Sequence, residues 1–219
     1  MLTFYYHPLS PIARRVWLAL LEKQLTFELI EVNLKSGEQH QPEFSALNPF
    51  HHVPVLTDGD LTLVESLAIL DYLDAKFPER SLSPTAPEAM ARMRMVQMVI
   101  ANELMTKLPL LVADPKAEAL SQQLNTAFTF LSAQLGEQPY FGGASLSLAD
   151  VVAGATLPLM CRLGVSFASY PTLEQWRSHI VQRPAWQQTT PSDAALVQWQ
   201  RWVGMMVRRR RQQQAKAKQ

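Results

Sequence analysis

Every strand-like segment of this 219-residue sequence lies before residue 66. Three such segments are rich in aromatic and β-branched residues, at 2–6, 26–33 and 53–65. The last of them is interrupted by Asp58-Gly59, a common hairpin turn, and therefore predicts two short strands. Helical spacing of apolar residues appears at 11–23 and 66–77. The order β-α-β-β-β-α predicts an α/β domain in which helices pack on a mixed sheet of four strands.

The remainder of the chain has a different character. Residues 78–86, "PERSLSPTA", have the composition of a linker, and no convincing strand follows them. Helical patterns instead cover about 88–112, 116–135, 148–163, 172–182 and 193–208. The sequence therefore predicts an α/β domain at 1–77, a linker at 78–86 and an all-helical domain at 87–219.

Composition excludes several classes of protein. Hydrophobic residues make up 47% and charged residues 18% of the chain, which is typical of globular proteins. The single cysteine, Cys161, excludes an intramolecular disulfide framework and favours a reducing, cytoplasmic setting. We find no apolar run of about 18 residues and no signal-peptide pattern, so no membrane span is expected.

The formal net charge of +1 conceals an uneven distribution. The last twelve residues, 208–219, contain four Arg and two Lys and no acid, which leaves −5 for the rest of the chain. We interpret the end from about 208 as a solvated basic tail. The alternative is that this basic tail contacts anionic lipid or nucleic acid, although we expect no nucleic-acid partner.

Ser10 stands immediately before the first helical stretch. Serine is a favoured N-cap and Pro11 suits the first helical position, so the cap alone explains the pair locally. A second reading gives Ser10 a chemical role as well, because a hydroxyl at a helix N-terminus stabilises a nearby anion.

Two further short motifs are candidates for binding. Val53-Pro54 precedes a strand, where proline fits an edge, a strand start or a cis turn that leaves the backbone of Val53 free to pair with a peptide. Glu65-Ser66 precedes a helix, with Ser66 as the expected N-cap. A helix N-terminus attracts a carboxylate and Glu65 an ammonium group, which together fit an α-amino-acid end. A plain edge proline and a plain cap remain the alternatives.

Taken together, these motifs resemble the cytosolic glutathione S-transferase family over nearly the whole chain. The resemblance rests on "SPIARRVWLAL", "NPFHHVPVL" and "DGDLTLVESLAILDYL" in the first part, and on "SLADVVAGATL", "YPTLEQWRSHI" and "RPAW" in the second. It implies a thioredoxin-like domain that binds glutathione, followed by an all-α domain. It further implies glutathione as co-substrate, no metal, a homodimer and a small hydrophobic electrophile as the second substrate.

The resemblance also implies roles for individual residues. Val53, before a cis Pro54, is similar to the residue whose backbone holds the cysteinyl part of glutathione. Glu65 and Ser66 match the positions that bind its γ-glutamyl end. His52 occupies a position where the family often has lysine near the glycyl carboxylate, and His40 is a further candidate there. Histidine in place of lysine weakens the charge attraction, and the histidines lack the spacing of a zinc site.

Conjugation requires the thiolate of glutathione, because the thiol is a poor nucleophile. Two residues are candidates for stabilising the thiolate. The serine-using branch of the family has a serine four residues before an arginine, which matches Ser10 and Arg14 and resembles bacterial, theta-like or tau-like members. The tyrosine-using branch has its tyrosine at the end of the first strand, to which Tyr6 can be aligned. We favour Ser10 and keep Tyr6 as the alternative.

The electrophile pocket is expected between the first loop and the helical domain. Its candidates are Leu9 and Ile12 from the first side, and Met98, Asn102 and Met105 from one face of the long helix. Methionine is adaptable and suits a broad pocket, but a methionine stripe also fits a core or a dimer interface.

The sequence thus predicts a glutathione transferase that conjugates hydrophobic electrophiles in detoxification, with reduction of organic hydroperoxides as a further possibility. The alternative is a non-catalytic binding or regulatory module with the same fold. An isomerase of the maleylacetoacetate type is less favoured, because its signature is a Ser-Ser-Cys run where this chain has "LSPIAR".

Overall fold

The computed structural model describes residues 1–113 and 118–216, excluding the side chains of 118, 119, 211 and 214–216. Its four strands are β1 (Leu2–Tyr6), β2 (Phe27–Glu31), β3 (Val55–Asp58) and β4 (Leu61–Leu63). They form one sheet in the order β2-β1-β3-β4, in which β1 runs parallel to β2 and antiparallel to β3. The predicted mixed sheet is therefore confirmed, including the β3–β4 hairpin.

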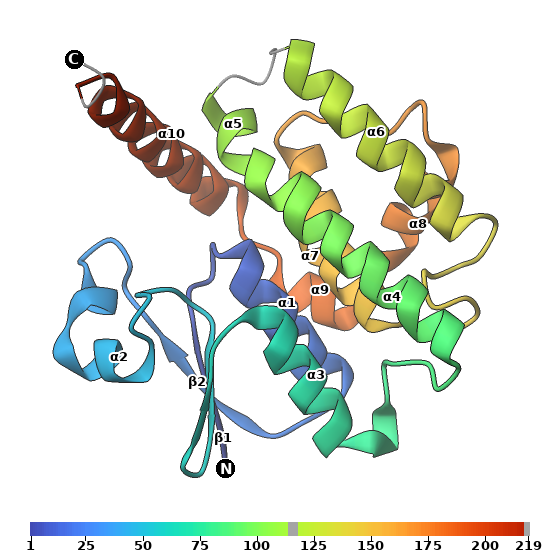
Figure 1. The fold of residues 1–219 in the computed structure, drawn as a ribbon, viewed down its shortest axis with the longest axis horizontal. Coiled ribbons are helices and arrows are strands. Elements are labelled where there is room, and N and C mark those ends of the chain that lie inside the picture. Colours follow the sequence, from blue (N-terminus) through green and yellow to red (C-terminus); the bar gives the residue numbers. More distant parts are fainter. Residues whose placement is uncertain (114–117, 217–219) are drawn as a thin grey trace.

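Three helices accompany the sheet: α1 (Pro11–Glu22), α2 (Pro42–Leu47) and α3 (Ser66–Lys76). Figure 1 shows α1 and α3 between the sheet and the helical half, with α2 on the other side. The sequence did not predict α2 or the 3₁₀ turn Glu38–His40, because both are short segments within a polar stretch. Pro42 is the first residue of α2, where a backbone N–H would have no partner within the helix, so proline costs nothing there. Phe44 is buried in the core and holds α2 against the sheet domain.

The other half of the protein consists of helices joined by loops, and its described residues form no β-strand. Its helices are α4 (Pro87–Val99), α5 (Leu108–Ala113), α6 (Glu118–Leu135), α7 (Leu148–Arg162), α8 (Pro171–Ile180), α9 (Pro184–Thr189) and α10 (Asp193–Lys216). Every residue of α7 from Leu148 to Met160 is buried, so α7 is the central helix of this half. The predicted combination of an α/β thioredoxin-like part and an all-α part is confirmed. The boundaries at 77 and 87 stay a prediction.

The long helix expected at 88–112 is interrupted. A π-helical turn at Ile100–Leu104 and a 3₁₀ turn at Met105–Lys107 separate α4 from α5. By length and composition alone, Pro87–Ala113 is apolar enough to cross a membrane, which differs from our expectation that no such segment exists. In the structure this segment packs against α6 and α7 and contributes to the core of the helical half.

The basic tail was expected to be a solvated end from about 208. Its described side chains, at 208–210, 212 and 213, are exposed to solvent as expected. The helix predicted to end near 208 is longer, however, because α10 continues to Lys216; residues 217–219 lie outside the described residues. The start of the helix predicted from 116 falls within 114–117 and is likewise outside them.

Asp150 fixes the start of α7. Its carboxylate accepts hydrogen bonds from the backbone N–H of Phe141, Gly142 and Ser147, at 2.8, 3.3 and 2.9 Å, from the Ser147 hydroxyl at 2.7 Å and from Trp176 Nε1 at 2.9 Å. Ser147 and Asp150 therefore form a capping box at the start of α7. Burial raises the pKa of Asp150, although these donors oppose the shift.

Candidate active site

Ser10 is the N-cap of α1, with an extended backbone at φ −85° and ψ 109°. Its Oγ accepts a hydrogen bond from the Ala13 N–H at 3.1 Å, and its carbonyl accepts one from the Arg14 N–H at 2.9 Å. A hydroxyl carries one donor in addition to its acceptor lone pairs, so capping leaves the Ser10 O–H proton available. The cap and a hydrogen bond donated to a ligand are therefore compatible.

His7 forms two hydrogen bonds that hold the loop preceding Ser10. The Leu9 N–H donates to His7 Nδ1 at 3.2 Å, and the Ser10 N–H donates to the His7 carbonyl at 2.9 Å. Burial lowers the pKa of His7, which favours the neutral ring needed for Nδ1 to accept. Sequence analysis did not identify His7, since a loop histidine carries no periodic signal.

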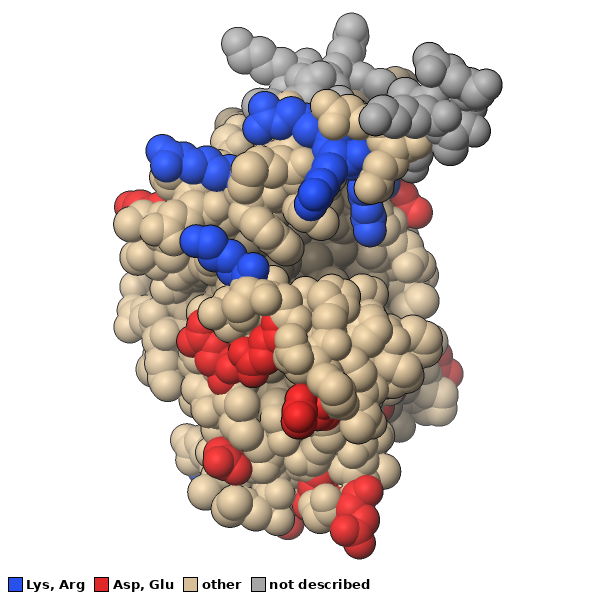
Figure 2. All heavy atoms as spheres, turned by 90° about the vertical axis from the view of Figure 1, so that its left-hand side faces the viewer, with Lys and Arg blue, Asp and Glu red and all other residues tan. Residues whose placement is uncertain are grey.

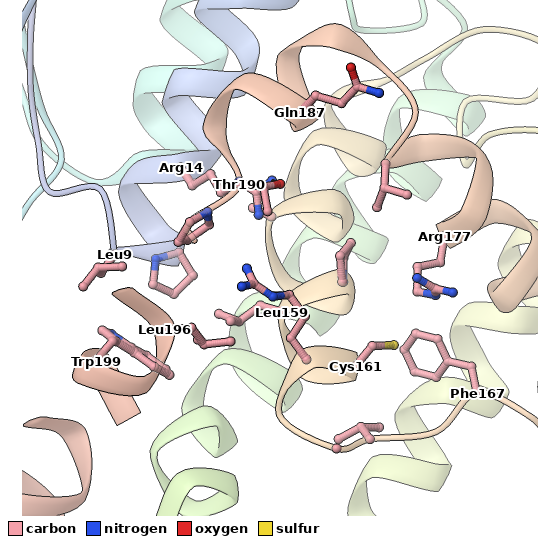
Figure 3. A pocket seen from close by; sticks show the side chains of 18 of the residues that line it. Leu9, Arg14, Leu159, Cys161, Phe167, Arg177, Gln187, Thr190, Leu196 and Trp199 are labelled. Carbon is pink, nitrogen blue, oxygen red and sulfur yellow. The ribbon is translucent and has the colours of Figure 1, made fainter. Parts of the chain in front are cut away.

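A cavity of about 990 Å³ opens between this loop and the helical half. On the first side it is lined by Pro8, Leu9, Ser10, Pro11 and Arg14. On the other side it is lined by the C-terminal half of α7, the loop at 164–168, parts of α8 and the 187–191 region, and Leu196 and Trp199 of α10. Figure 3 shows Leu9 and Trp199 towards one end, with Phe167 and Arg177 towards the other.

Arg14, one turn after Ser10, is a buried cation with neutral partners. Its Nε donates to Thr189 Oγ1 at 3.0 Å, and its Nη2 donates to Thr190 Oγ1 at 2.9 Å and to the Trp186 carbonyl at 3.2 Å. Burial, and secondarily the charge of Arg162, lower the pKa of Arg14 to about 10, so it stays charged at neutral pH. The start of α1 therefore has positive potential both from its backbone and from a side chain.

Tyr6, the alternative to Ser10, occupies a different environment. Its ring is buried in the core of the sheet, 4.8 Å from the Trp17 ring centroid in an edge-to-face arrangement, and it is absent from the cavity lining. Burial, and secondarily the charge of Glu31, raise the pKa of the Tyr6 hydroxyl.

The Val53–Pro54 bond is cis, and both residues are buried just before β3. Near it, Glu65 has a left-handed φ of 66° and occupies the N-cap position of α3. This corrects the expectation that Ser66 is the cap, since the helix already begins at Ser66. Ser66 is buried, whereas Glu65 is exposed.

Arg15, which sequence analysis overlooked, is buried next to Ser66. Its Nη1 donates to Ser66 Oγ at 3.4 Å, while Nε and Nη2 have no hydrogen-bond partner. Burial lowers the pKa of Arg15 to about 10. The only sequence signal was the second arginine of "ARRV", which is indistinguishable from a surface charge until its burial is known.

The three histidines at 40, 51 and 52 lie in the segment around α2. His40 and His52 are exposed, and the His40 ring lies 4.8 Å from that of His51. His51 Nδ1 bonds to the Gln39 carbonyl at 2.9 Å. Across the described residues, no group of three His, Cys, Asp or Glu side chains could hold a metal ion.

The predicted electrophile-binding residues are distributed unevenly. Leu9 lines the cavity, whereas Ile12, Met98, Asn102 and Met105 are absent from its lining. Ile12 and Met98 are exposed, and the Met105 sulfur accepts a hydrogen bond from Thr156 at 3.3 Å. Arg162 and Phe167 line the cavity but gave no sequence signal, because Arg162 is the last residue of a buried helix and Phe167 lies in the loop after it.

The sequence was compared with models of known protein families and with known proteins. Residues 4–81 match the N-terminal domain of glutathione S-transferases, and residues 99–184 match the C-terminal domain. The chain is 35% identical to glutathione S-transferase 3 of Zea mays over 207 residues, covering 86% of this chain and 92% of the relative. It is 33% identical to a probable maleylacetoacetate isomerase of Vibrio cholerae over 209 residues, covering 88% of this chain and 96% of the relative.

Among solved structures, a delta-class glutathione transferase of Nilaparvata lugens superposes with a TM-score of 0.80 at 25% identity. The match covers 94% of this chain and 100% of the other. Because the two family matches together span most of the chain and follow the order of its sheet and helices, the protein belongs to the glutathione S-transferase family and is a glutathione transferase.

Proposed function

We propose that Ser10 activates glutathione by donating a hydrogen bond to its sulfur and so favouring the thiolate. The observation that carries this proposal is the position of Ser10 at the N-terminus of α1 on the wall of the cavity. The helix N-terminus adds partial positive charge there, and the buried cation Arg14 adds a full one. Tyr6 is less favoured, because its ring is buried in the sheet.

Glutathione lies along the C-terminal side of the sheet domain in this proposal. The backbone of Val53, beside the cis Pro54, pairs with the cysteinyl residue. Glu65 and Ser66 bind the γ-glutamyl end. The guanidinium of Arg15, whose Nε and Nη2 have no hydrogen-bond partner, adds positive charge beside Ser66. His52 and His40 are the candidates for the glycyl carboxylate, since both are exposed on the adjoining segment.

The second substrate is a small hydrophobic electrophile that enters the cavity beside Ser10. Its ring or chain packs on apolar side chains such as Leu9, Leu159 and Trp199. The thiolate sulfur then bonds to the electrophilic carbon. Reduction of an organic hydroperoxide by two glutathione molecules is a second reaction that the same thiolate supports, and it stays a prediction.

A homodimer and a cytoplasmic location stay predictions for this chain. The exposed methionines Met95 and Met98 on α4 support a dimer, since methionines on an otherwise polar face are often covered by a partner. Light scattering at micromolar concentration tests this point, because a mass of one chain, 24.7 kDa, would contradict it.

Two measurements test the proposal. Isothermal titration with glutathione is expected to show binding at or below millimolar concentration. Conjugation of glutathione to an aryl halide and an isothiocyanate is expected to exceed the uncatalysed rate, as is the reduction of cumene hydroperoxide. Absence of glutathione binding would instead favour the non-catalytic module, and binding without any turnover would remove the role assigned to Ser10.

A further inference from the structure

Two arginines that are far apart in the sequence line the same cavity. Arg14 comes from the first turns of α1, and Arg162 is the last residue of α7. Both are part of the cavity lining, and the charge of Arg162 is a secondary cause of the lowered pKa of Arg14, after burial. The cavity therefore has two like charges on its wall, an arrangement that costs stability unless an anion compensates it.

Neither arginine is neutralised inside the cavity. The three hydrogen-bond acceptors of Arg14 are two threonine hydroxyls and a backbone carbonyl. Arg162 pairs with Asp193 at 2.8 Å, but the Asp193 side chain is 97% exposed. An ion pair with such an exposed partner contributes little and can be exchanged for a ligand.

The other charged residues of the lining leave this excess in place. Arg177 forms an ion pair with Glu174, so these two cancel. In the part of the chain that the structure describes, Glu174 is the only acidic residue of the cavity lining. On the face of the molecule shown in Figure 2, basic residues gather in the upper part and acidic residues in the lower part.

The rest of the wall is apolar. Leu159, Leu196 and Trp199 lie together in Figure 3, near Leu9 and the start of α1. A ligand that fits both features has an aromatic or aliphatic body and one anionic group. The carboxylates of glutathione do not account for the excess, since their proposed partners lie around α2 and at the start of α3.

We propose that the electrophile is an anionic amphiphile whose carboxylate or sulfonate is bound by Arg162, with the buried charge of Arg14 supporting it. This inference rests on the proposed function and adds a substrate class to it. For an aryl chloride, the thiolate sulfur forms a C–S bond at the ring carbon, the C–Cl bond breaks and chloride leaves. The thiol proton passes to solvent when the thiolate forms.

The experiment compares two electrophiles that differ only in charge: 4-chloro-3,5-dinitrobenzoate and its carboxamide. For each, kcat/KM with glutathione is divided by the uncatalysed rate constant. We expect the wild-type ratio of carboxylate to carboxamide to exceed one. Arg162→Gln is expected to lower that ratio about tenfold to a hundredfold, the effect of losing a hydrogen bond to a charged group. Arg201→Gln, on the exposed face of α10 and outside the cavity lining, is the matched control and should leave the ratio unchanged.

Calorimetric titration with the two finished thioether conjugates gives a readout independent of turnover. Tighter binding of the anionic conjugate, lost in Arg162→Gln and kept in Arg201→Gln, supports the proposal. If both electrophiles react, and the ratio of carboxylate to carboxamide is the same in wild type and in Arg162→Gln, this inference is overturned. The assignment as a transferase would then stand. Failure of both electrophiles to react, with equal binding of both conjugates, would overturn the proposed function and this inference together.

Discussion

The two ends of the cavity place sulfur in opposite environments. At the Ser10 end, where we propose that the sulfur of glutathione binds, the hydroxyl, the N-terminus of α1 and the charge of Arg14 would all favour a thiolate. Near Cys161, burial raises the pKa of the thiol to about 11, and the charges of Arg177 and Glu174 act in opposing directions. If glutathione binds as we propose, the two ends teach that arginines beside a sulfur do not activate it when the sulfur is itself buried, as Cys161 is.

The largest expected effect concerns the helix that carries the Cys161 end. Asp150→Ala leaves five donors at the start of α7 without their acceptor, and three of them are buried. At about 1–3 kcal/mol for each unsatisfied group, we expect the free energy of unfolding to fall by at least about 3 kcal/mol. Urea denaturation measures the loss. Asp60→Ala, at an exposed position, is the control and should change stability by about 0.5 kcal/mol or less.

The next effect tests the Cys161 end directly. Cys161 is the only cysteine, so alkylation reports on it alone. With a pKa of about 11, its thiolate fraction near pH 8.5 is small, and we expect alkylation by iodoacetamide to be about a hundredfold slower than for free cysteine. The rate should rise with pH up to 9.5 and match free cysteine after unfolding in urea. Rapid labelling of the folded protein at pH 7.5 would contradict the comparison.

The Ser10 end is tested by Ser10→Ala. Loss of the hydrogen bond to sulfur should reduce conjugation at neutral pH about tenfold to a hundredfold and raise the apparent pKa of bound glutathione. The stability cost of the lost cap is about 1 kcal/mol. The pH–rate profile measures the pKa. A wild-type profile in Ser10→Ala, together with an inactive Tyr6→Phe variant, would instead identify Tyr6 as the activating residue.

The smallest effect is expected on the stability of Ser10→Asp. Aspartate caps a helix as well as serine does, so the free energy of unfolding should change by about 0.5 kcal/mol or less. Its negative charge opposes a neighbouring thiolate, so conjugation should still fall by at least as much as in Ser10→Ala. A loss of stability equal to that of Ser10→Ala would show that the cap geometry differs from that observed.

The Ser10 end could be predicted from sequence, because its determinants are local. The cap, the following proline and Arg14 lie within five residues, and the proline at 54 precedes a strand that is itself predicted. The Cys161 end could not. Its wall combines α7, the loop at 164–168 and α8, which lie far apart in the sequence. Even Arg14 finds its acceptors at Thr189 and Thr190.

The fold shows the same division. Strands and long helices followed from periodicity, whereas the six-residue α2 carried too short a pattern to be detected. The π-helical turn at Ile100–Leu104 also lacked a sequence signal, since its residues continue the apolar spacing of α4. Both features depend on packing against distant segments, which a local pattern does not contain.

The burial of α1 has a consequence for how the protein unfolds. Ala13, Val16 and Leu20 belong to the core beneath the sheet, while Leu18 and Ala19 belong to the core of the helical half. Melting α1 therefore removes part of both cores at once, so we expect one calorimetric transition rather than two. A fragment that ends near residue 77 would expose the second face of α1 to water, and its isolated sheet domain is expected to be a poor autonomous folding unit.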